Sequence, residues 1–293
     1  MPQHEISDST KGILFATLAA ALNGTIGVLS KFLMESGLTS ASIAFFKSLI
    51  GFICLLIVIR GEVESTTAYL RAGVCAFFGI FILFYFETSA YHHELAANVV
   101  LTLMAFATIS AFILSWIFIG DKPTPTRWLG LAICVIGLAV FLGVSRPTNL
   151  TGLIYASIAG LGYGAFSVIA KAMKLGSGLA VTRRLLLFGS IYLAFPFVSN
   201  GAISPDWSIG AWTALLTLAL LPSIGGFYCT TRAIELATPA QIQLFELTEP
   251  LFAALLAVLF LNEFPGLNTY LGGALVVIGL FVSQQNFGKK YCH

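Results

Sequence analysis

The chain of 293 residues is too apolar for a water-soluble fold: 58% of its residues are hydrophobic, 10% are charged, and the mean hydropathy is +0.93. Soluble domains carry about 25% charged residues, so most of this surface must face lipid. The net charge of +2 is too small to indicate a basic surface for nucleic-acid binding. The five cysteines are scattered and form no C-x-x-C pair, which argues against a zinc site or a disulfide framework.

About ten apolar segments are long enough to cross a bilayer, whose hydrocarbon core needs roughly 20 helical residues. The first five cover approximately residues 12–33, 42–59, 70–90, 97–119 and 127–144, and the second five cover 152–173, 182–199, 209–234, 240–261 and 269–284. Their apolar runs are continuous rather than alternating, which favours helices over strands. The polar first eleven residues do not resemble a secretory signal, so we expect the first helix to be retained.

Lysine and arginine are concentrated on one side of these spans. If the N-terminus is cytoplasmic, all of the 15 lysines and arginines fall on the cytoplasmic side except Lys31, Lys47 and Arg146. Cytoplasmic loops of membrane proteins carry this excess. The pattern predicts an even number of spans in the cell (inner) membrane, with both termini in the cytoplasm.

The two halves of the chain resemble each other in three blocks that occur in the same order. Residues 12–31 align without gaps on 152–171, residues 84–91 on 227–234, and residues 119–140 on 261–282. Each half holds five spans, an odd number, so the second half must enter the membrane inverted. The predicted fold is an all-α polytopic membrane protein of two inverted five-helix repeats, with a cytoplasmic tail at 1–11, repeats at 12–146 and 147–284, and a second tail at 285–293.

Inverted repeats are typical of secondary transporters. Two inverted copies have two nearly equivalent packings, one open to each side of the membrane. Exchange between them gives alternating access to a site near the midplane. The sequence therefore predicts a transporter for a small-molecule substrate, and the alternative is a passive channel or facilitator for small polar solutes.

An intramembrane enzyme is not expected. The segment that starts at His93-Glu94 begins like the zinc motif H-E-x-x-H, but Ala97 replaces the second histidine. All three aspartates lie in the tail or in loops, which leaves no aspartyl pair within the membrane. We predict no catalytic residue, cofactor or metal site.

The whole chain resembles the drug/metabolite transporter superfamily, and most closely its EamA-type members, which include metabolite and amino-acid exporters. The clearest fingerprint is residues 249–263, EPLFAALLAVLFLNE, which is similar to the family's signature near the penultimate helix. The resemblance implies that the first four helices of each half line a central cavity. It also implies that the fifth helices are peripheral and contribute to a homodimer contact. The first half departs from the pattern, with Ala107 and Thr108 at the places of Glu249 and Pro250.

Ionisable residues inside spans are costly and are functional candidates by default. Glu246 and Glu249 lie three residues apart, hence on one helical face, and either bind an amine, exchange a proton or hydrogen-bond neighbouring helices. Lys47 and Glu87 form a candidate gate or a static ion pair. For Arg184 there are two interpretations: its side chain faces the cavity as part of the gate, or its charge determines the orientation of the chain in the membrane.

Uncharged residues complete the candidate substrate site. Asn23 and Tyr163 occupy matched positions in the two halves, and Asn98 opens the fourth span. We expect these residues either to bind an asymmetric organic ligand or to form polar contacts between helices. The matched tyrosines Tyr85 and Tyr228 are aromatic walls suited to a cationic or ring-bearing substrate. These patterns together favour export of an amino acid or a related amphipathic compound.

Overall fold

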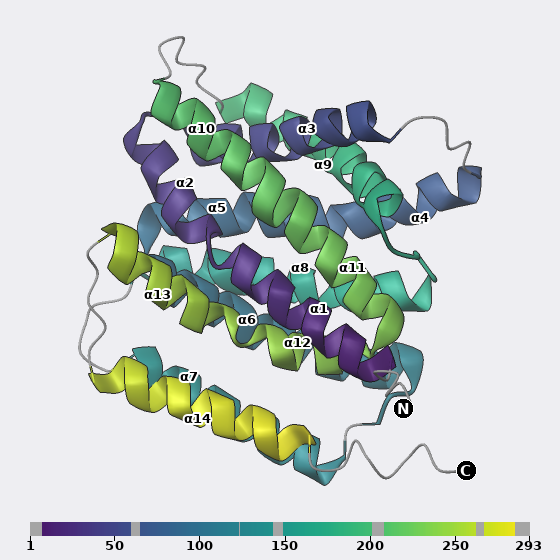
Figure 1. The fold of residues 1–293 in the computed structure, drawn as a ribbon, viewed down its shortest axis with the longest axis vertical. Helices are drawn as coiled ribbons and strands as arrows, with labels where there is room; N and C mark the ends of the chain where they lie inside the picture. The colour runs from purple at the N-terminus through teal and green to yellow at the C-terminus, as the bar shows by residue number, and fades with distance from the viewer. Residues whose placement is uncertain are drawn as a thin grey trace, which may run out of the picture.

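The computed structural model describes residues 8–59, 65–122, 124–142, 149–200, 208–261 and 267–284 (Figure 1). Within these ranges every regular element is a helix. The first half contains α1 (Asp8–Asn23), α2 (Ile26–Glu35), α3 (Ser40–Val58), α4 (Thr66–Ala76), η1 (Phe77–Ile82), α5 (Leu83–His93), α6 (Ala96–Leu114), η2 (Ser115–Ile119) and α7 (Pro125–Leu142). The second half contains α8 (Leu150–Ala172), α9 (Leu179–Asn200), α10 (Ile209–Leu218), η3 (Ala219–Gly226), α11 (Phe227–Leu236), α12 (Pro239–Glu246), α13 (Glu249–Leu261) and α14 (Leu267–Gln284).

Eight helical rods are long and apolar enough to cross a membrane: 8–35, 40–58, 66–93, 96–119, 150–172, 179–200, 209–236 and 239–260. The two remaining helices, α7 and α14, are shorter apolar helices that pack against each other along the bottom edge of the bundle in Figure 1. The all-helical membrane fold is confirmed, and the count of ten spans stays a prediction.

Polar side chains at the helix starts satisfy backbone N–H groups that have no partner within the helix. Thr39 caps α3, Ser65 caps α4 and Ser208 caps α10, each through a side-chain oxygen that accepts from a backbone N–H three residues ahead. Thr238 and Gln241 form a reciprocal capping box at the start of α12. These caps occur where the chain re-enters the apolar bundle, and there they fix the starting residue of each helix.

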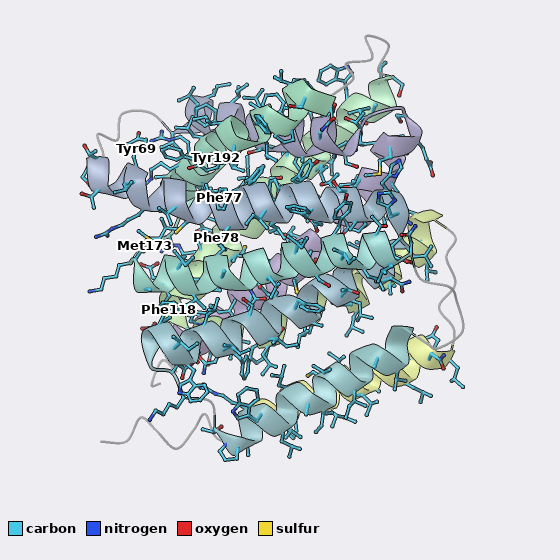
Figure 2. All side chains as sticks on the ribbon, turned by 180° about the vertical axis from the view of Figure 1, so that it is seen from behind. Tyr69, Phe77, Phe78, Phe118, Met173 and Tyr192 are labelled. Carbon is cyan, nitrogen blue, oxygen red and sulfur yellow. The ribbon has the colours of Figure 1, made fainter. Side chains whose placement is uncertain are left out.

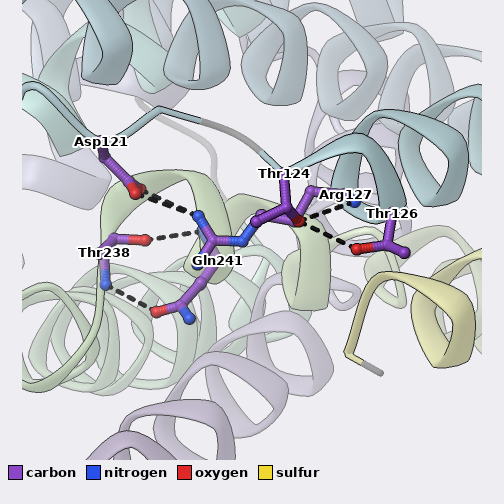
Figure 3. Close-up of polar contacts among 6 residues, drawn as sticks. All are labelled: Asp121, Thr124, Thr126, Arg127, Thr238 and Gln241. Atoms are coloured by element: carbon purple, nitrogen blue, oxygen red, sulfur yellow. Dashed lines mark hydrogen bonds and ion pairs between the residues drawn. The ribbon is translucent and has the colours of Figure 1, made fainter. Parts of the chain in front are cut away.

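The turn into α7 is pinned by the polar cluster shown in Figure 3. Asp121 accepts hydrogen bonds of 3.1 and 3.3 Å from Nη1 of Arg127, and the Thr124 hydroxyl accepts from the Arg127 backbone N–H. Gly120 adopts a left-handed conformation (φ +76°) that reverses the chain before this turn. The capping box of α12 lies beside the cluster in Figure 3, so the loops before α7 and α12 meet at one end of the bundle.

Contacts at the helix ends show that the two halves are inverted. α8 begins beside Glu94, whose carboxylate accepts a 2.6 Å hydrogen bond from the Asn149 backbone N–H, and ends where Lys171 Nζ donates to the Ile234 carbonyl at 2.7 Å. α1 begins against Ala237, at the end of the bundle where α8 finishes. The matched first helices therefore run in opposite directions, as the repeat predicts. We call the Lys171 end proximal and the Glu94 end distal.

A pseudo-twofold relation between the halves extends to individual packing contacts. Gly12 packs on residues 236–237, and its partner Gly152 packs on residues 93–94, which are the matched positions of the other half. Gly137 on α7 contacts Gly272, while Gly279 on α14 contacts residues 130 and 134. The halves also interleave, since α5 and α6 pack on α8, α3 on α9, and α1 on α11. The core is therefore shared between the two repeats.

Two helical rods are broken near the middle of the bundle, and two others carry π-helical segments at matched positions. The first rod breaks at residues 24–25, between α1 and α2, and the eighth at residues 247–248, between α12 and α13. The π-helical η1 and η3 lie in the third rod of each half. Such interruptions expose backbone groups that a regular helix would satisfy, and they are frequent at functional sites.

Several sequence predictions fall outside the described residues. These are the topology determinants Arg60, Arg146, Lys289 and Lys290, the boundary between repeats at 146–147, and the tail at 285–293. The first helix begins at Asp8, inside the tail predicted for residues 1–11.

Candidate functional site

A small cavity lies at the centre of the bundle, where the two broken rods meet. Its volume is about 20 Å³, roughly the space that one water molecule needs. Both halves contribute to its lining: Asn23, Ile26, Lys47, Leu83, Phe84, Glu87, Leu103, Met104, Tyr163, Pro222, Ser223, Phe227 and Glu249. Five of the residues singled out in the sequence, Asn23, Lys47, Glu87, Tyr163 and Glu249, therefore meet at one place.

The first half contributes a buried ion pair. Lys47 Nζ lies 3.6 Å from Glu87 Oε2, with side-chain exposures of 1% and 3%. The same ammonium group is 3.5 Å from the Thr88 hydroxyl and 4.0 Å from the centre of the Phe84 ring. Tyr91 donates a 3.3 Å hydrogen bond to Glu87 Oε1. Lys47 thus points into the bundle, and its ammonium group does not extend to the membrane surface.

The second half contributes a carboxyl group with many donors. Glu246 Oε1 accepts from Tyr163 at 3.0 Å and from Thr230 at 3.2 Å, and Oε2 accepts from Gln243 Nε2 at 2.9 Å. Gln243 also donates to Ser167 at 3.0 Å, which ties the network to α8. Three donors to one buried carboxyl group stabilise it in place beside the cavity.

Glu249 differs from Glu246 because its carboxyl group is incompletely satisfied. It is 2% exposed, lines the cavity and lies within hydrogen-bonding reach of Asn23. Its Oε2 atom has no hydrogen-bond partner among the described residues. Leaving a buried carboxyl oxygen without a donor is costly, so this atom is a candidate point of contact for cargo.

The helix break separates the two glutamates that the sequence placed on one helical face. Glu246 is the last residue of α12 and Glu249 the first of α13, with a turn at residues 247–248 between them. An unbroken helix would have kept both carboxyl groups on the same stripe. The break instead allows Glu246 to join the Tyr163 network while Glu249 reaches the cavity.

Phe84 and Phe227 are the matched aromatic residues that reach the cavity, and each lies one position before a tyrosine expected there. Tyr85 instead stacks on Phe81, with ring centroids 6.2 Å apart, and Tyr228 contacts Phe15 and Arg232. One residue turns a helix by about 100°, so neighbouring positions face different surroundings. The repeat thus indicated the two helical turns that reach the cavity, one in each half. Only the structure shows which side chains of those turns face the cavity.

Two further candidates lie away from the cavity. Asn98 donates to Glu94 Oε1 at 2.8 Å near the distal end, and Arg184 Nε donates to the Ala180 carbonyl at 3.4 Å near the start of α9. Three polar residues of the site were not predicted from the sequence: Thr230 and Gln243, which donate to Glu246, and Ser223, which lines the cavity. Their small or amide side chains carry no charge, so no intramembrane-charge signal marks them.

Two other hollows clarify what the central cavity can do. A hollow of about 290 Å³ at the distal end is lined by Lys31, Tyr91, His92, His93, Glu94, Leu95 and Asn149. Tyr91 therefore borders this hollow and also hydrogen-bonds Glu87, which lines the central cavity. The Tyr91 side chain lies between the distal hollow and the Glu87 carboxylate, and we call it the Tyr91 wall.

The second hollow, about 530 Å³, opens at the surface between α4–η1 and α9. Figure 2 shows Tyr69, Phe77, Phe78 and Tyr192 gathered there, and Tyr192 donates a 3.2 Å hydrogen bond to the Gly73 carbonyl. None of the described residues that line this groove is charged. The central cavity is thus the better match for polar cargo.

Comparison with known proteins identifies related sequences along nearly the whole chain. The model of the EamA-like transporter family matches twice, at residues 10–143 and 150–284. The uncharacterized transporter YwfM of Bacillus subtilis is 24% identical over 277 residues, covering 92% of each chain. The two family matches coincide with the two repeats detected in the sequence.

Two relatives carry more informative names. The pseudopaline exporter CntI of Pseudomonas aeruginosa is 24% identical over 280 residues, covering 91% of this chain and 93% of its own. A probable terminal-alkyne amino-acid exporter of Streptantibioticus cattleyicolor is 26% identical over 199 residues, covering 64% of each. A solved crystal structure superposes with a TM-score of 0.70 at 16% identity, covering 95% of this chain and 98% of the other, and it supports the fold alone.

Proposed function

The chain belongs to the EamA-like transporter family, as residues 249–263 predict, and from that premise we propose that it exports an amino acid or a related amphipathic metabolite by alternating access. The observation that carries the proposal is the small, charge-lined cavity at the junction of two inverted halves. The names of two relatives, an amino-acid exporter and a pseudopaline exporter, support the direction and the kind of cargo.

The cavity is too small for an amino acid, so this arrangement corresponds to a closed form of the carrier. Opening toward the distal end requires the Tyr91 wall to move, and opening toward the proximal end requires the contacts around Lys171 to part. The breaks in the first and eighth rods and the paired π-helical segments provide hinges at the level of the cavity. Inverted halves make the two openings alike in energy.

In this proposal the proximal end is cytoplasmic and the distal end faces outward in the cell membrane. Lys11, Lys174 and Arg232 lie toward the proximal end, in agreement with the positive-inside rule. Arg71, in α4, donates through Nη1 to the carbonyl of Lys174, which precedes α9, at 3.3 Å. This contact supports a common membrane face for the start of α4 and the loop before α9.

We further propose that α7 and α14 mediate a homodimer. The two helices pack tightly on each other, while Ile136, Tyr270, Ile278 and Phe281 remain exposed on their outer surfaces. Disulfide cross-linking of Ile278→Cys in native membranes tests this, with Val198→Cys on exposed α9 as the control position. A cross-linked dimer specific to position 278 supports the contact, and equal cross-linking at both positions refutes it.

Reconstitution into liposomes tests the transport proposal. The purified chain is supplied with labelled amino acids and organic cations, with and without a pH gradient, and both net flux and counterflow are measured. A carrier gives saturable flux and accelerated exchange when unlabelled substrate is present on the opposite side. A channel, the alternative, gives flux proportional to concentration and no counterflow. Absence of flux for the whole panel contradicts both.

A further inference from the structure

The ion pair in the central cavity is held by long contacts. The Lys47 ammonium group is 3.6 Å from Glu87, 3.5 Å from Thr88 and 4.0 Å from the Phe84 ring centre. Well-formed charge-assisted bonds between nitrogen and oxygen are about 2.7–2.9 Å long. The pair is therefore buried and yet poorly optimised, which makes it replaceable by a closer-fitting partner.

Acceptor oxygens without donors lie on two sides of the cavity. Glu87 Oε2 comes from the first half and Glu249 Oε2 from the second, and neither accepts a hydrogen bond among the described residues. Both residues line the cavity and are 2% exposed. An ammonium group between them could donate to both halves at once, whereas the Lys47 ammonium group lies against Glu87, Thr88 and Phe84 of the first half.

Charge balance then defines the cargo. Removing one partner from a buried ion pair leaves an uncompensated charge, which is strongly unfavourable. A simple amine that took Glu87 would leave Lys47 unpaired, and a simple carboxylate that took Lys47 would leave Glu87 unpaired. A molecule with both groups compensates both residues in the same binding event.

We propose, building on the transport function proposed above, that the cargo is a zwitterion that inserts between Lys47 and Glu87. The carboxylate of the cargo pairs with Lys47, and its ammonium group bridges Glu87 and Glu249. In the empty carrier, Lys47 and Glu87 pair with each other and replace the missing zwitterion. With the Glu249 carboxyl group protonated, this closed state has no isolated charge, so the carrier can return without cargo and net transport is possible.

The substrate test needs no mutation. For each of the twenty common amino acids, inhibition of flux and binding to purified chain in nanodiscs are measured beside its decarboxylated amine and its deaminated acid. For leucine these are 3-methylbutylamine and 4-methylpentanoate. At least one amino acid is expected to bind about 100-fold more tightly than either counterpart. The inference is overturned if no amino acid is preferred over its own amine and acid.

Charge-removing variants test the assigned partners. Lys47→Gln leaves Glu87 without a partner and is expected to shift preference toward the amine, whereas Glu87→Gln is expected to shift it toward the acid. The double variant removes both charges, avoids an isolated buried charge, and is expected to lose the preference for zwitterions. Glu35→Gln, an exposed carboxylate at the end of α2, is the control and should behave as the wild type.

The two proposals fail in different ways. Absence of saturable flux for every compound contradicts the transport function. Two other outcomes leave the transport function intact and refute insertion into the ion pair. In the first, flux is saturable but amines are carried as well as amino acids. In the second, Lys47→Gln and Glu87→Gln change the substrate preference in the same direction.

Discussion

Phe84 and Phe227 occupy matched positions of the two repeats and meet edge to face, with ring centroids 5.5 Å apart and planes at 80°. A residue that contacts its own repeat partner must lie close to the pseudo-twofold axis. Both rings also line the central cavity. The axis therefore passes through the candidate site, as expected for a carrier whose halves exchange conformations around a central substrate.

Glu249 should be required for transport. Glu249→Gln keeps the size of the side chain and replaces a carboxyl oxygen that would accept from the ammonium group of the cargo, so we expect saturable flux to fall by about tenfold or more as this hydrogen bond is lost. Initial rates in liposomes, normalised to folded protein, measure the effect. Glu35→Gln is the control, and an unchanged flux and pH dependence in Glu249→Gln would remove Glu249 from the site.

Tyr163 should contribute to stability through Glu246. Tyr163→Phe removes a hydroxyl that donates to a fully buried carboxyl group, and we expect a loss of about 1–3 kcal/mol in the free energy of unfolding. Thermal unfolding in detergent measures the change. Tyr270→Phe, on the exposed face of α14, should leave the unfolding temperature as in the wild type. Equal effects in both variants would contradict a specific role for the Tyr163 hydroxyl.

The crossing of α7 and α14 should depend on glycine. A Cβ atom added at Gly137 would lie 2.8 Å from the Gly272 carbonyl oxygen, which is backbone and cannot rotate away. We expect Gly137→Ala to destabilise the chain by about 1–3 kcal/mol. Gly210→Ala is the matched control, since its nearest neighbour would be a Phe32 ring atom at 3.4 Å. A smaller effect at Gly137 than at Gly210 would contradict this packing.

Tyr91 should act as the distal wall of the cavity. Tyr91→Ala joins the central cavity to the distal hollow, and we expect a leak component that rises linearly with substrate concentration, whereas Tyr91→Phe should keep the wall and lose only the hydrogen bond to Glu87. Efflux from preloaded liposomes over a range of concentrations separates the two components. Identical leak in both variants would assign the effect to the hydroxyl.

The orientation in the membrane can be tested by cysteine labelling. In a Cys292→Ser background, Ser36→Cys at the end of α2 should react with an impermeant thiol reagent applied to intact cells. Ser177→Cys in the loop before α9 should react only after the membrane is opened. Labelling of both from outside would contradict inverted halves with the proximal end in the cytoplasm.

The sequence by itself determined the class, the repeat and the family of this protein. Composition alone requires a lipid environment, and the blocks at residues 12–31 and 152–171 predict the inversion that the contacts of Asn149 and Lys171 confirm. These properties are readable because they are sums or periodicities along the chain. Intramembrane charge likewise marked Lys47, Glu87 and Glu249, since an ionisable residue in an apolar span stands out without any knowledge of packing.

Only the tertiary structure decided which neighbours share the cavity. It selected Phe84 over Tyr85, because one position along a helix rotates a side chain by about 100°. It also placed Glu246 and Glu249 in different environments, because the chain leaves the helix between them. The direction in which a side chain points, the position of a helix break and the number of hydrogen-bond donors around a carboxyl group all depend on packing. They are decided by contacts between elements far apart in the chain, and no single segment carries that information.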